Sequence, residues 1–293
     1  MNLQRTFIPG EEWVFLKIYG GPKFLEQVLV QEIYGILEEM NHTNINYYFF
    51  IRYADPDYHI RLRMHNLDPG PNYPIIASLT SALAQKVRDR SLWRISYETY
   101  HREIERYGSR CIELVEQLFY LDSTTILKFL LESDCGNEFR WLYSMYWIDQ
   151  LTSAFQFSDD KKANFFDGRV RAYASEFDLQ KWARVNMDKK YRKVSGQIDR
   201  LLLADGKDFI SRNIKPGVFM FGKDSATLID KILEMDSRGM LEIDLDSLVS
   251  SLIHMHVNRM FRTRPRVYEL LIYYFLNKFH RSRMARNKYS LNP

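Results

Sequence analysis

The sequence lacks the short motifs that build nucleotide and zinc sites. Neither GxGxxG nor GxxxxGK occurs in its 293 residues, which removes the usual phosphate-binding loops. HExxH and CxxC are absent as well. The two cysteines, Cys111 and Cys135, show neither metal-ligand spacing nor a disulfide framework. We therefore predict reduced thiols and a cytoplasmic location.

Long hydrophobic segments are also missing. No apolar run approaches the roughly 20 residues that are needed to cross a bilayer, and the mean hydropathy is −0.36. The first residues, MNLQRTFIPGEEW, lack the apolar stretch of a secretion signal. We expect no membrane insertion. The hydrophobic content of 46% is enough for one large core or two modest ones.

Asp and Glu are slightly fewer than Lys and Arg, which gives a formal net charge of +4 and a pI of about 8.8. Much of the excess lies in the Arg-rich segment 259–293. Such a segment can bind nucleic acid or an acidic peptide. A solvated helix face that ends in a frayed terminus explains the same residues without a ligand, so no direct nucleic-acid partner is expected.

The pattern of apolar residues predicts an α+β protein. Aromatic and β-branched runs bounded by turn residues indicate four strands, and two segments with helical spacing lie among them. In chain order these are a strand (12–20), a helix (23–40), a hairpin of two strands (45–53 and 58–65), a helix (76–90) and a strand (92–100). This order is typical of a ferredoxin-like βαββαβ unit.

From residue 109 onward the predicted elements are all helical. The segments with helical spacing, several with Ser, Asp or Thr caps, are 111–133, 139–157, 195–213, 224–240 and 245–261. No repeat, low-complexity tract or long linker interrupts the sequence. We predict a single domain over 1–293, in which a sheet unit (1–108) runs directly into a helical half (109–293).

The return strand of the hairpin in FIRYADPDYHIRLRMH (50–65) has two contrasting faces, because alternate side chains point to opposite sides. Its basic positions are His59, Arg61, Arg63 and His65, and its apolar positions are Ile60, Leu62 and Met64. We expect the apolar face to pack under the helices and the basic face to look out from the open side of the sheet. A hydrated basic face is one explanation. A bound anion is the other, because it would relieve the repulsion between neighbouring cations.

A second polar segment, YHREIERYG (100–108), follows the last predicted strand. Glu103 and Arg106 lie three residues apart, and Arg102 and Arg106 lie four apart, as in a surface helix with local ion pairs. Taken alone, the segment indicates no more than such a helix.

A third segment, SSLIHMHVNRMF (250–261), carries two histidines on one predicted helix. His256 lies on the apolar stripe, which is typical of a core histidine. His254 lies on a more polar flank, with Asn258 one helical turn away and close enough to contact its ring. The two rings cannot share one helix face, which argues against a joint metal site.

Taken together and in this order, five segments resemble the family of the C-terminal domain of class I lanthipeptide dehydratases. They are FLKIYG, FIRYADPDYHIRLR, YHREIERYG, VEQLFYLDS and SLIHMHVNRMF, and the resemblance runs from about residue 12 to residue 277. Stand-alone members are often called thiopeptide-type bacteriocin biosynthesis proteins. The sequence departs from the commoner pattern at Ser109, where family members usually have a second glycine after RYG.

The resemblance implies the second stage of a two-stage dehydration. In this family a separate, larger domain transfers glutamate from glutamyl-tRNA to Ser or Thr of a precursor peptide. The C-terminal domain then eliminates that glutamate and leaves dehydroalanine or dehydrobutyrine. We therefore expect a lyase that acts on a glutamylated precursor peptide as the elimination half of a split dehydratase, beside a separate tRNA-dependent glutamylating protein. No cofactor or metal is implied, and homodimer formation is left open.

The residue types suit this chemistry. Histidine is the natural base for the Cα proton near neutral pH, and arginine stays protonated and can hold a carboxylate or an enolate oxygen. The resemblance implies glutamyl recognition by Arg61, Arg63 and Arg106, and a catalytic histidine in HMHVNR, for which we choose His254. Further candidate substrate-binding residues are Arg52, His59, Glu103, His256 and Asn258.

Two alternative functions are open. Some stand-alone members of the same family form a six-membered nitrogen heterocycle from two dehydroamino acids by a formal [4+2] cycloaddition. Such enzymes need not hold a glutamate, so the set of three arginines and a histidine would be expected to erode, and here it is intact. The other alternative is a non-catalytic subunit that binds the precursor peptide.

Overall fold

The computed structural model describes residues 3–41, 43–67, 73–132, 137–203 and 222–290. The chain divides into two compact units. Unit 1 comprises 1–134 and 218–263 and holds both sheets, whereas unit 2 comprises 135–217 and 264–293 and is helical. Three helices that follow residue 108 belong to unit 1, so this division does not coincide with the border expected between a sheet unit and a helical half.

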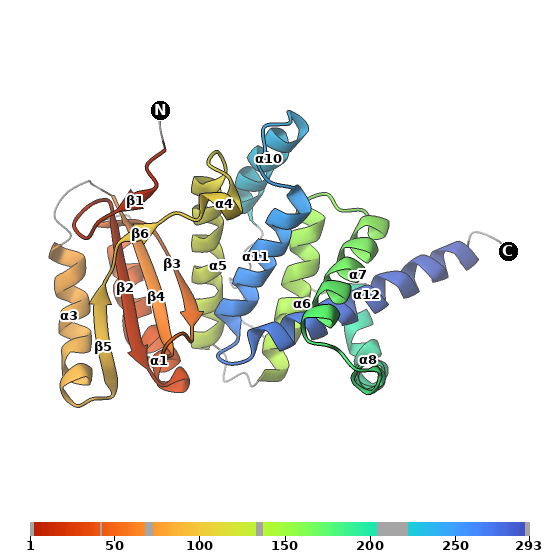
Figure 1. Ribbon diagram of the computed structural model, residues 1–293, viewed down its shortest axis with the longest axis horizontal. Helices are drawn as coiled ribbons and strands as arrows, with labels where there is room; N and C mark the ends of the chain where they lie inside the picture. The colour runs from red at the N-terminus through yellow and green to blue at the C-terminus, as the bar shows by residue number, and fades with distance from the viewer. Residues whose placement is uncertain (1–2, 42, 68–72, 133–136, 204–221, 291–293) are drawn as a thin grey trace. The chain divides into compact units, whose positions relative to one another are not determined.

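Unit 1 is built around a four-stranded antiparallel sheet with the strand order β3-β4-β2-β5 (Figure 1). Its strands are β2 (Trp13–Gly20), β3 (Ile45–Tyr53), β4 (His59–Asn66) and β5 (Leu92–Tyr97). The helices between them in sequence are α1 (Pro22–Val28), the π-helical η1 (Leu29–Ile33), α2 (Tyr34–Met40) and α3 (Tyr73–Arg88). The order of strands and helices along this segment is the one expected from the sequence.

The apolar face of β4 forms the core beneath the helices, as predicted. Ile60, Leu62 and Met64 are each 0% exposed. In the antiparallel register Ile60 lies opposite Ile18 of β2, and side chains of paired residues share one face. Helix α1 packs against both of these strands.

The basic face of β4 is covered, which corrects the expectation of an open face. A short ribbon formed by β1 (Thr6–Phe7) and β6 (Tyr100–His101) lies over it, at the upper end of the sheet in Figure 1. The Tyr100 ring contacts Trp13 of β2 at a centroid distance of 4.8 Å. Arg63 beneath it is only 6% exposed. At the other end of β4, His59 is 1% exposed and contacts the rings of Tyr19 and Tyr53.

Strand β3, at one edge of the sheet, contacts α5 (Ile112–Glu132) and α11 (Leu245–Met260). The predicted apolar stripe of α11 is confirmed, because its members are all buried: Leu248, Val249, Leu252, Ile253, His256 and Met260. Two further helices, α4 (Ile104–Tyr107) and α10 (Lys223–Ser237), complete unit 1.

Unit 2 consists of α6 (Asn137–Ala154), α7 (Asp159–Glu176), α8 (Lys181–Leu202) and α12 (Pro265–Ser290), and α12 packs against the other three. A buried polar cluster links three of them: Lys162 Nζ lies 2.8 Å from Asp149 Oδ1, and His280 Nε2 lies 2.9 Å from the same oxygen. Cys135 and the second half of the helix expected over 195–213 lie outside the described residues. In the part of the chain that the structure describes, no helix has the length and apolarity to cross a membrane.

Candidate active site

Arg63 is a buried cation surrounded by aromatic rings. Its guanidinium carbon lies 4.4 Å from the ring centroid of Phe15, 5.1 Å from that of Tyr100 and 5.4 Å from that of Phe49. Burial lowers the pKa of this guanidinium. Its Nε is buried without a hydrogen-bond acceptor, and no carboxylate in the described ranges forms an ion pair with it. Rings attract a cation but leave its N–H groups unsatisfied, so the site has an unmet demand for an acceptor.

Arg61 is held in place two residues earlier on the same face of β4. Its guanidinium carbon lies 3.6 Å from the ring centroid of Tyr53, and its Nε donates to Nε2 of His59 at 3.1 Å. The other ring nitrogen of His59 lies 2.8 Å from the carbonyl oxygen of Asp57. A neutral ring protonated on Nδ1 satisfies both contacts, and burial lowers the pKa of His59 in agreement with that state. His59 therefore orients Arg61.

His65 ends the basic face as an uncharged ring. It stacks on Tyr47 with a centroid distance of 4.6 Å and meets Trp13 edge-on at 5.1 Å. Burial, assisted by the charge of Arg102, lowers the pKa of His65 to about 4. Its Nε2 lies 3.8 Å from a carboxylate oxygen of Glu12, but a ring with this pKa is neutral near pH 7, so the contact is no ion pair there.

The free energy of unfolding should fall as the pH drops from about 6.5 toward 4. Unfolded His65 takes up a proton near its ordinary pKa of 6.5, whereas the folded ring resists protonation down to about 4. At roughly 1.4 kcal/mol per unit, this residue contributes up to about 3 kcal/mol of that loss. Urea unfolding at several pH values should show a flatter dependence for His65→Gln. Equal slopes in the two proteins would contradict the assignment.

Glu103 and Arg106 lie at the two ends of α4, the single helical turn that follows β6. Arg106 Nη1 lies 3.6 Å from a carboxylate oxygen of Glu103, and its Nε donates to Ser251 Oγ of α11 at 3.3 Å. Ser251 precedes His254 by about one helical turn. Arg106 thus connects α4 to the polar flank of α11.

Tyr107 marks the point where α4, α11 and β4 come together. Burial raises the pKa of its hydroxyl to about 12. The charged side chains that also act on it are Arg106, Glu103, Arg259 and Arg63. The predicted residues Arg63, Glu103 and Arg106 therefore share one neighbourhood in unit 1.

Ser109, the departure from the family pattern, has a defined contact. Its hydroxyl donates to Glu242 Oε1 at 2.6 Å, and its backbone N–H also donates to that carboxylate. The preceding Gly108 has a φ of +79° and would place a Cβ 3.1 Å from Glu242 Oε2. The loop therefore requires glycine at position 108 and uses the serine hydroxyl at position 109.

Asn258 fixes α11 against the edge strand. Its Oδ1 accepts from the N–H of Arg52 at 2.8 Å, and its Nδ2 donates to the carbonyl of Arg52 at 2.8 Å. The side-chain amide thus occupies the position that a neighbouring strand would take beside β3. The sequence placed Asn258 within reach of the His254 ring and among the substrate-binding candidates, whereas in the structure both ends of its amide bind the strand.

Arg52 does not lie with the other basic residues of the hairpin. Its pairing partner on β4 is Ile60, so its side chain lies on the face opposite Arg61 and Arg63. There it is 4% exposed, and its Nη2 lies 2.7 Å from a carboxylate oxygen of Glu26. Its charge is neutralised inside the core by Glu26, so this substrate-binding candidate lies apart from Arg61 and Arg63.

His256 lies in a buried network beneath α11. It is 0% exposed, and its Nδ1 lies 2.7 Å from Asp122 Oδ1. Arg259 Nη1 donates to the other oxygen of Asp122 at 2.9 Å, and Arg259 Nε donates to the carbonyl of Phe50 at 2.8 Å. This geometry agrees with a core histidine. It leaves His254, which is half-buried, as the histidine of α11 with access to solvent.

Replacing Asn258 with alanine should lower the free energy of unfolding by about 1–3 kcal/mol, because the N–H and the carbonyl of Arg52 lose their partner. Asn258→Asp should not restore stability, since it keeps an acceptor but places a carboxylate against a carbonyl oxygen. Urea unfolding of the three proteins measures the difference. An alanine variant as stable as the native protein would show that the amide does not secure α11.

Sequence reasoning missed two residues of the buried network. Asp122 lies within VEQLFYLDS and Arg259 within SLIHMHVNRMF, both among the segments that carry the family resemblance. Their place in those segments was the available signal, but no sequence pattern pairs an aspartate with residues more than 130 positions away. Among the described residues, no group of three or more His, Cys, Asp and Glu side chains is arranged to hold a metal ion.

Comparison with known proteins identifies relatives of the whole chain. The subtilin biosynthesis protein SpaB of Bacillus subtilis is 26% identical over 271 residues, which cover 88% of this chain and 24% of SpaB. The crystal structure of the tRNA-dependent lantibiotic dehydratase MibB from Microbispora sp. 107891 matches with a TM-score of 0.71 and 17% identity, over 96% of this chain and 29% of MibB. The pyridine synthase TbtD from thiomuracin biosynthesis matches with a TM-score of 0.53 and 12% identity, over 92% of this chain and 98% of TbtD.

These similarities support different conclusions about the fold and the family. The two solved structures share the fold, and the chain spans about a quarter of the length of the curated relative SpaB. The sequence model of the lantibiotic biosynthesis dehydratase C-terminal family matches residues 13–280, which include every candidate residue named above. The chain therefore belongs to the family of lantibiotic biosynthesis dehydratase C-terminal domains.

Proposed function

We propose that the chain eliminates glutamate from glutamylated Ser and Thr residues of a precursor peptide. A base removes the Cα proton of the esterified residue, and the electron pair forms the Cα–Cβ double bond. The Cβ–O bond breaks, and glutamate leaves as a carboxylate. The products are dehydroalanine or dehydrobutyrine and free glutamate, and no electron is gained or lost overall.

The observation that carries this proposal is the missing partner of Arg63. Among the described residues of unit 1 the buried arginines are Arg52, Arg63, Arg102 and Arg259. Three of them pair with a carboxylate at 2.7 to 2.9 Å, namely Glu26, Glu116 and Asp122. Arg63 alone in this group has none, although an unpaired buried charge is costly. A substrate carboxylate would complete the same pairing.

The neighbouring residues supply complementary roles. Arg61 lies on the same face, so the two guanidinium groups together suit the side-chain carboxylate of a glutamyl group esterified through its α-carboxyl. Glu103, half-exposed beside Arg106, is suited to the α-ammonium of that group. We assign Arg106 to the developing negative charge and His254 to the Cα proton. Histidine near neutral pH can accept that proton without a metal or cofactor.

The arrangement also supports two finer assignments. The strands lie in the order β3-β4-β2-β5, and helices follow β2 and β4, which are the first and third of these strands along the sequence. This arrangement supports a ferredoxin-like sheet unit. The tRNA dependence of MibB supports a tRNA-dependent source of the glutamyl group, and we propose a separate protein as that source. The precursor peptide and this glutamylating protein are then the two partners.

Formation of a nitrogen heterocycle is the second candidate, because the chain matches the pyridine synthase TbtD over 98% of its length. That reaction joins two dehydroamino acids and leaves no glutamate to bind. It gives Arg63 and Arg61 no carboxylate to hold, so the unpaired buried guanidinium favours elimination.

Incubation of the purified chain with a synthetic peptide bearing one glutamyl-serine ester tests the function. Mass spectrometry should show loss of one glutamate per ester and appearance of dehydroalanine, and the same peptide with free serine should stay unchanged. Recovery of intact ester or simple hydrolysis back to serine would contradict the proposal. Conversion of a peptide with two dehydroamino acids into a heterocycle would favour the second candidate.

A further inference from the structure

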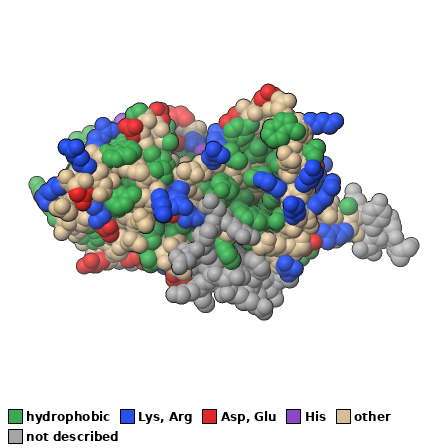
Figure 2. All heavy atoms as spheres, turned by 90° about the horizontal axis from the view of Figure 1, so that it is seen from below, with side chains coloured by type: hydrophobic (Ala, Val, Ile, Leu, Met, Phe, Trp, Pro, Cys, Tyr) green, Lys and Arg blue, Asp and Glu red, His purple; other side chains and the backbone are tan. Residues whose placement is uncertain are grey.

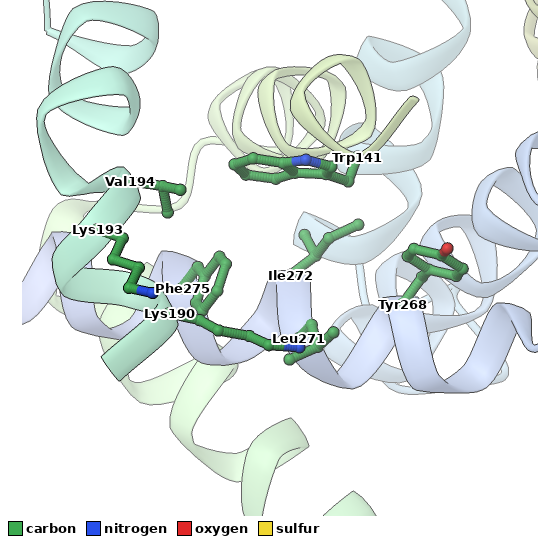
Figure 3. Close-up of a pocket in the computed structure, with 8 residues that line it drawn as sticks. All are labelled: Trp141, Lys190, Lys193, Val194, Tyr268, Leu271, Ile272 and Phe275. Carbon is green, nitrogen blue, oxygen red and sulfur yellow. The ribbon is translucent and has the colours of Figure 1, made fainter. Parts of the chain in front are cut away.

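Unit 2 contains an apolar cavity that the proposed function does not use. It measures about 250 Å³ and lies between α6, α8 and α12 (Figure 3). Its lining residues are Trp141, Lys190, Lys193, Val194, Tyr268, Leu271, Ile272 and Phe275. The Trp141 ring meets Phe275 edge-on at a centroid distance of 6.0 Å, which gives the cavity a rigid aromatic wall.

Two lysines form the rim of this cavity on the α8 side. Lys190 and Lys193 are exposed, and neither forms an ion pair with any described residue. Figure 3 shows both side chains on α8 among the residues that line the cavity. The cavity therefore presents an apolar interior next to two positive charges.

The rest of α8 strengthens this positive charge. The helix holds seven basic and two acidic residues, an excess larger than the +4 of the whole chain. Its two acids are already engaged, since Asp188 lies 2.8 Å from Lys278 Nζ and Asp199 lies 3.6 Å from Arg286 Nη2. Figure 2, which views the side where α8 lies in Figure 1, shows Lys and Arg gathered around an apolar area. The acidic residues of α8 are therefore not available to Lys190 and Lys193.

The chemistry of the lining decides between two kinds of anionic partner. RNA would satisfy the lysines, but a nucleobase needs hydrogen-bonding groups along its edges, and the interior offers almost none. An apolar side chain needs none and fits a dry, aromatic-walled space. A protein segment that combines carboxylates with one apolar anchor satisfies both features.

We propose that this surface docks an acidic amphipathic helix of a partner protein. An apolar side chain of that helix enters the cavity against the wall formed by Trp141 and Phe275, and its carboxylates face Lys190 and Lys193. These lysines lie three residues apart on α8 and so point to the same side, within reach of carboxylates on successive turns. The surface belongs to unit 2 alone and includes none of the candidate active-site residues, so this proposal stands apart from the proposed function.

Fluorescence anisotropy with a designed probe tests the proposal. The probe is a labelled helical peptide of about 18 residues, with Leu on one face and Glu on the other. It should bind the native chain, and replacement of its Glu residues by Gln should weaken binding at least about tenfold. The double variant Lys190→Glu/Lys193→Glu should cause a similar loss. Lys189→Glu/Arg192→Glu makes the same charge change on the same helix outside the lining, and should cost less than about threefold.

A cavity-filling variant separates docking from general attraction to a basic surface. Val194→Trp, or Leu271→Trp if the first is poorly folded by thermal melt, should weaken peptide binding at least about tenfold because the anchor loses its space. Failure of the native chain to bind the probe, or equal losses in the two charge-reversal pairs, would overturn the proposal. Tight binding of bulk tRNA that displaces the peptide and ignores the cavity-filling change would assign the surface to RNA.

Discussion

Replacing Arg63 with methionine should slow elimination about 100-fold without destabilising the protein. The substitution removes a buried charge that has no carboxylate partner, so the free energy of unfolding should stay level or rise. The carboxylate of the glutamyl group would lose its paired hydrogen bonds, and kcat/KM should fall by about 100-fold or more. Arg63→Lys should recover little, because a point charge cannot make the paired contact. Urea unfolding and single-ester elimination assays on the same preparations measure both effects.

Two of the three paired arginines of unit 1 provide matched controls. Arg259→Met removes the guanidinium that pairs with Asp122, and Arg102→Met removes the one that pairs with Glu116. Each should lower the free energy of unfolding by about 3–5 kcal/mol, because a buried carboxylate loses the guanidinium that pairs with it. If Arg63→Met were destabilised to the same degree, Arg63 would be a structural cation, and its role in substrate binding would fail.

Replacing His254 with glutamine should stop elimination while the glutamylated peptide still binds. Loss of a positioned base typically costs about 100- to 10,000-fold in rate. The ring is half-buried on α11, so its loss should change stability little. Anisotropy of a labelled glutamylated peptide reports binding, and quenched time courses report elimination. Normal turnover by His254→Gln would place the base elsewhere.

His256→Gln is the control for this assignment. Its ring is fully buried against Asp122, so the substitution should lower the free energy of unfolding by about 1–3 kcal/mol while the folded fraction still eliminates. A well-folded but inactive His256→Gln protein, together with an active His254→Gln protein, would reverse the roles of the two histidines.

The alternation of residue types along the sequence was sufficient to predict β4, the strand that carries Arg61 and Arg63. The two-residue period of β4 predicted which side chains share a face, because it follows from backbone geometry alone. Coverage of the basic face was not predictable in the same way. The strands of the β1–β6 ribbon have two residues each, too few to show any period, and they lie more than 90 positions apart in the sequence.

Residues held by long-range contacts were the hardest to place. Arg52 follows a run of aromatic residues and reads as part of the basic cluster, but its pairing with Ile60 turns it toward Glu26. Asn258 reads as a neighbour of His254 on one helix, and its actual partner lies 206 residues away. Helix α7 (159–176) was missed because charged residues make up much of the segment.

The most direct test of the account compares two esters in two proteins. One peptide carries serine esterified to glutamate through the α-carboxyl, and the other carries the matching glutamine ester, which lacks only the side-chain charge. The native chain should eliminate the glutamate ester about 100-fold faster, in kcat/KM, than the glutamine ester. In Arg63→Met this ratio should collapse toward one, because the variant can no longer recognise the carboxylate. A ratio that stays unchanged in the variant would contradict the assignment of Arg63 as the residue that holds the glutamyl group.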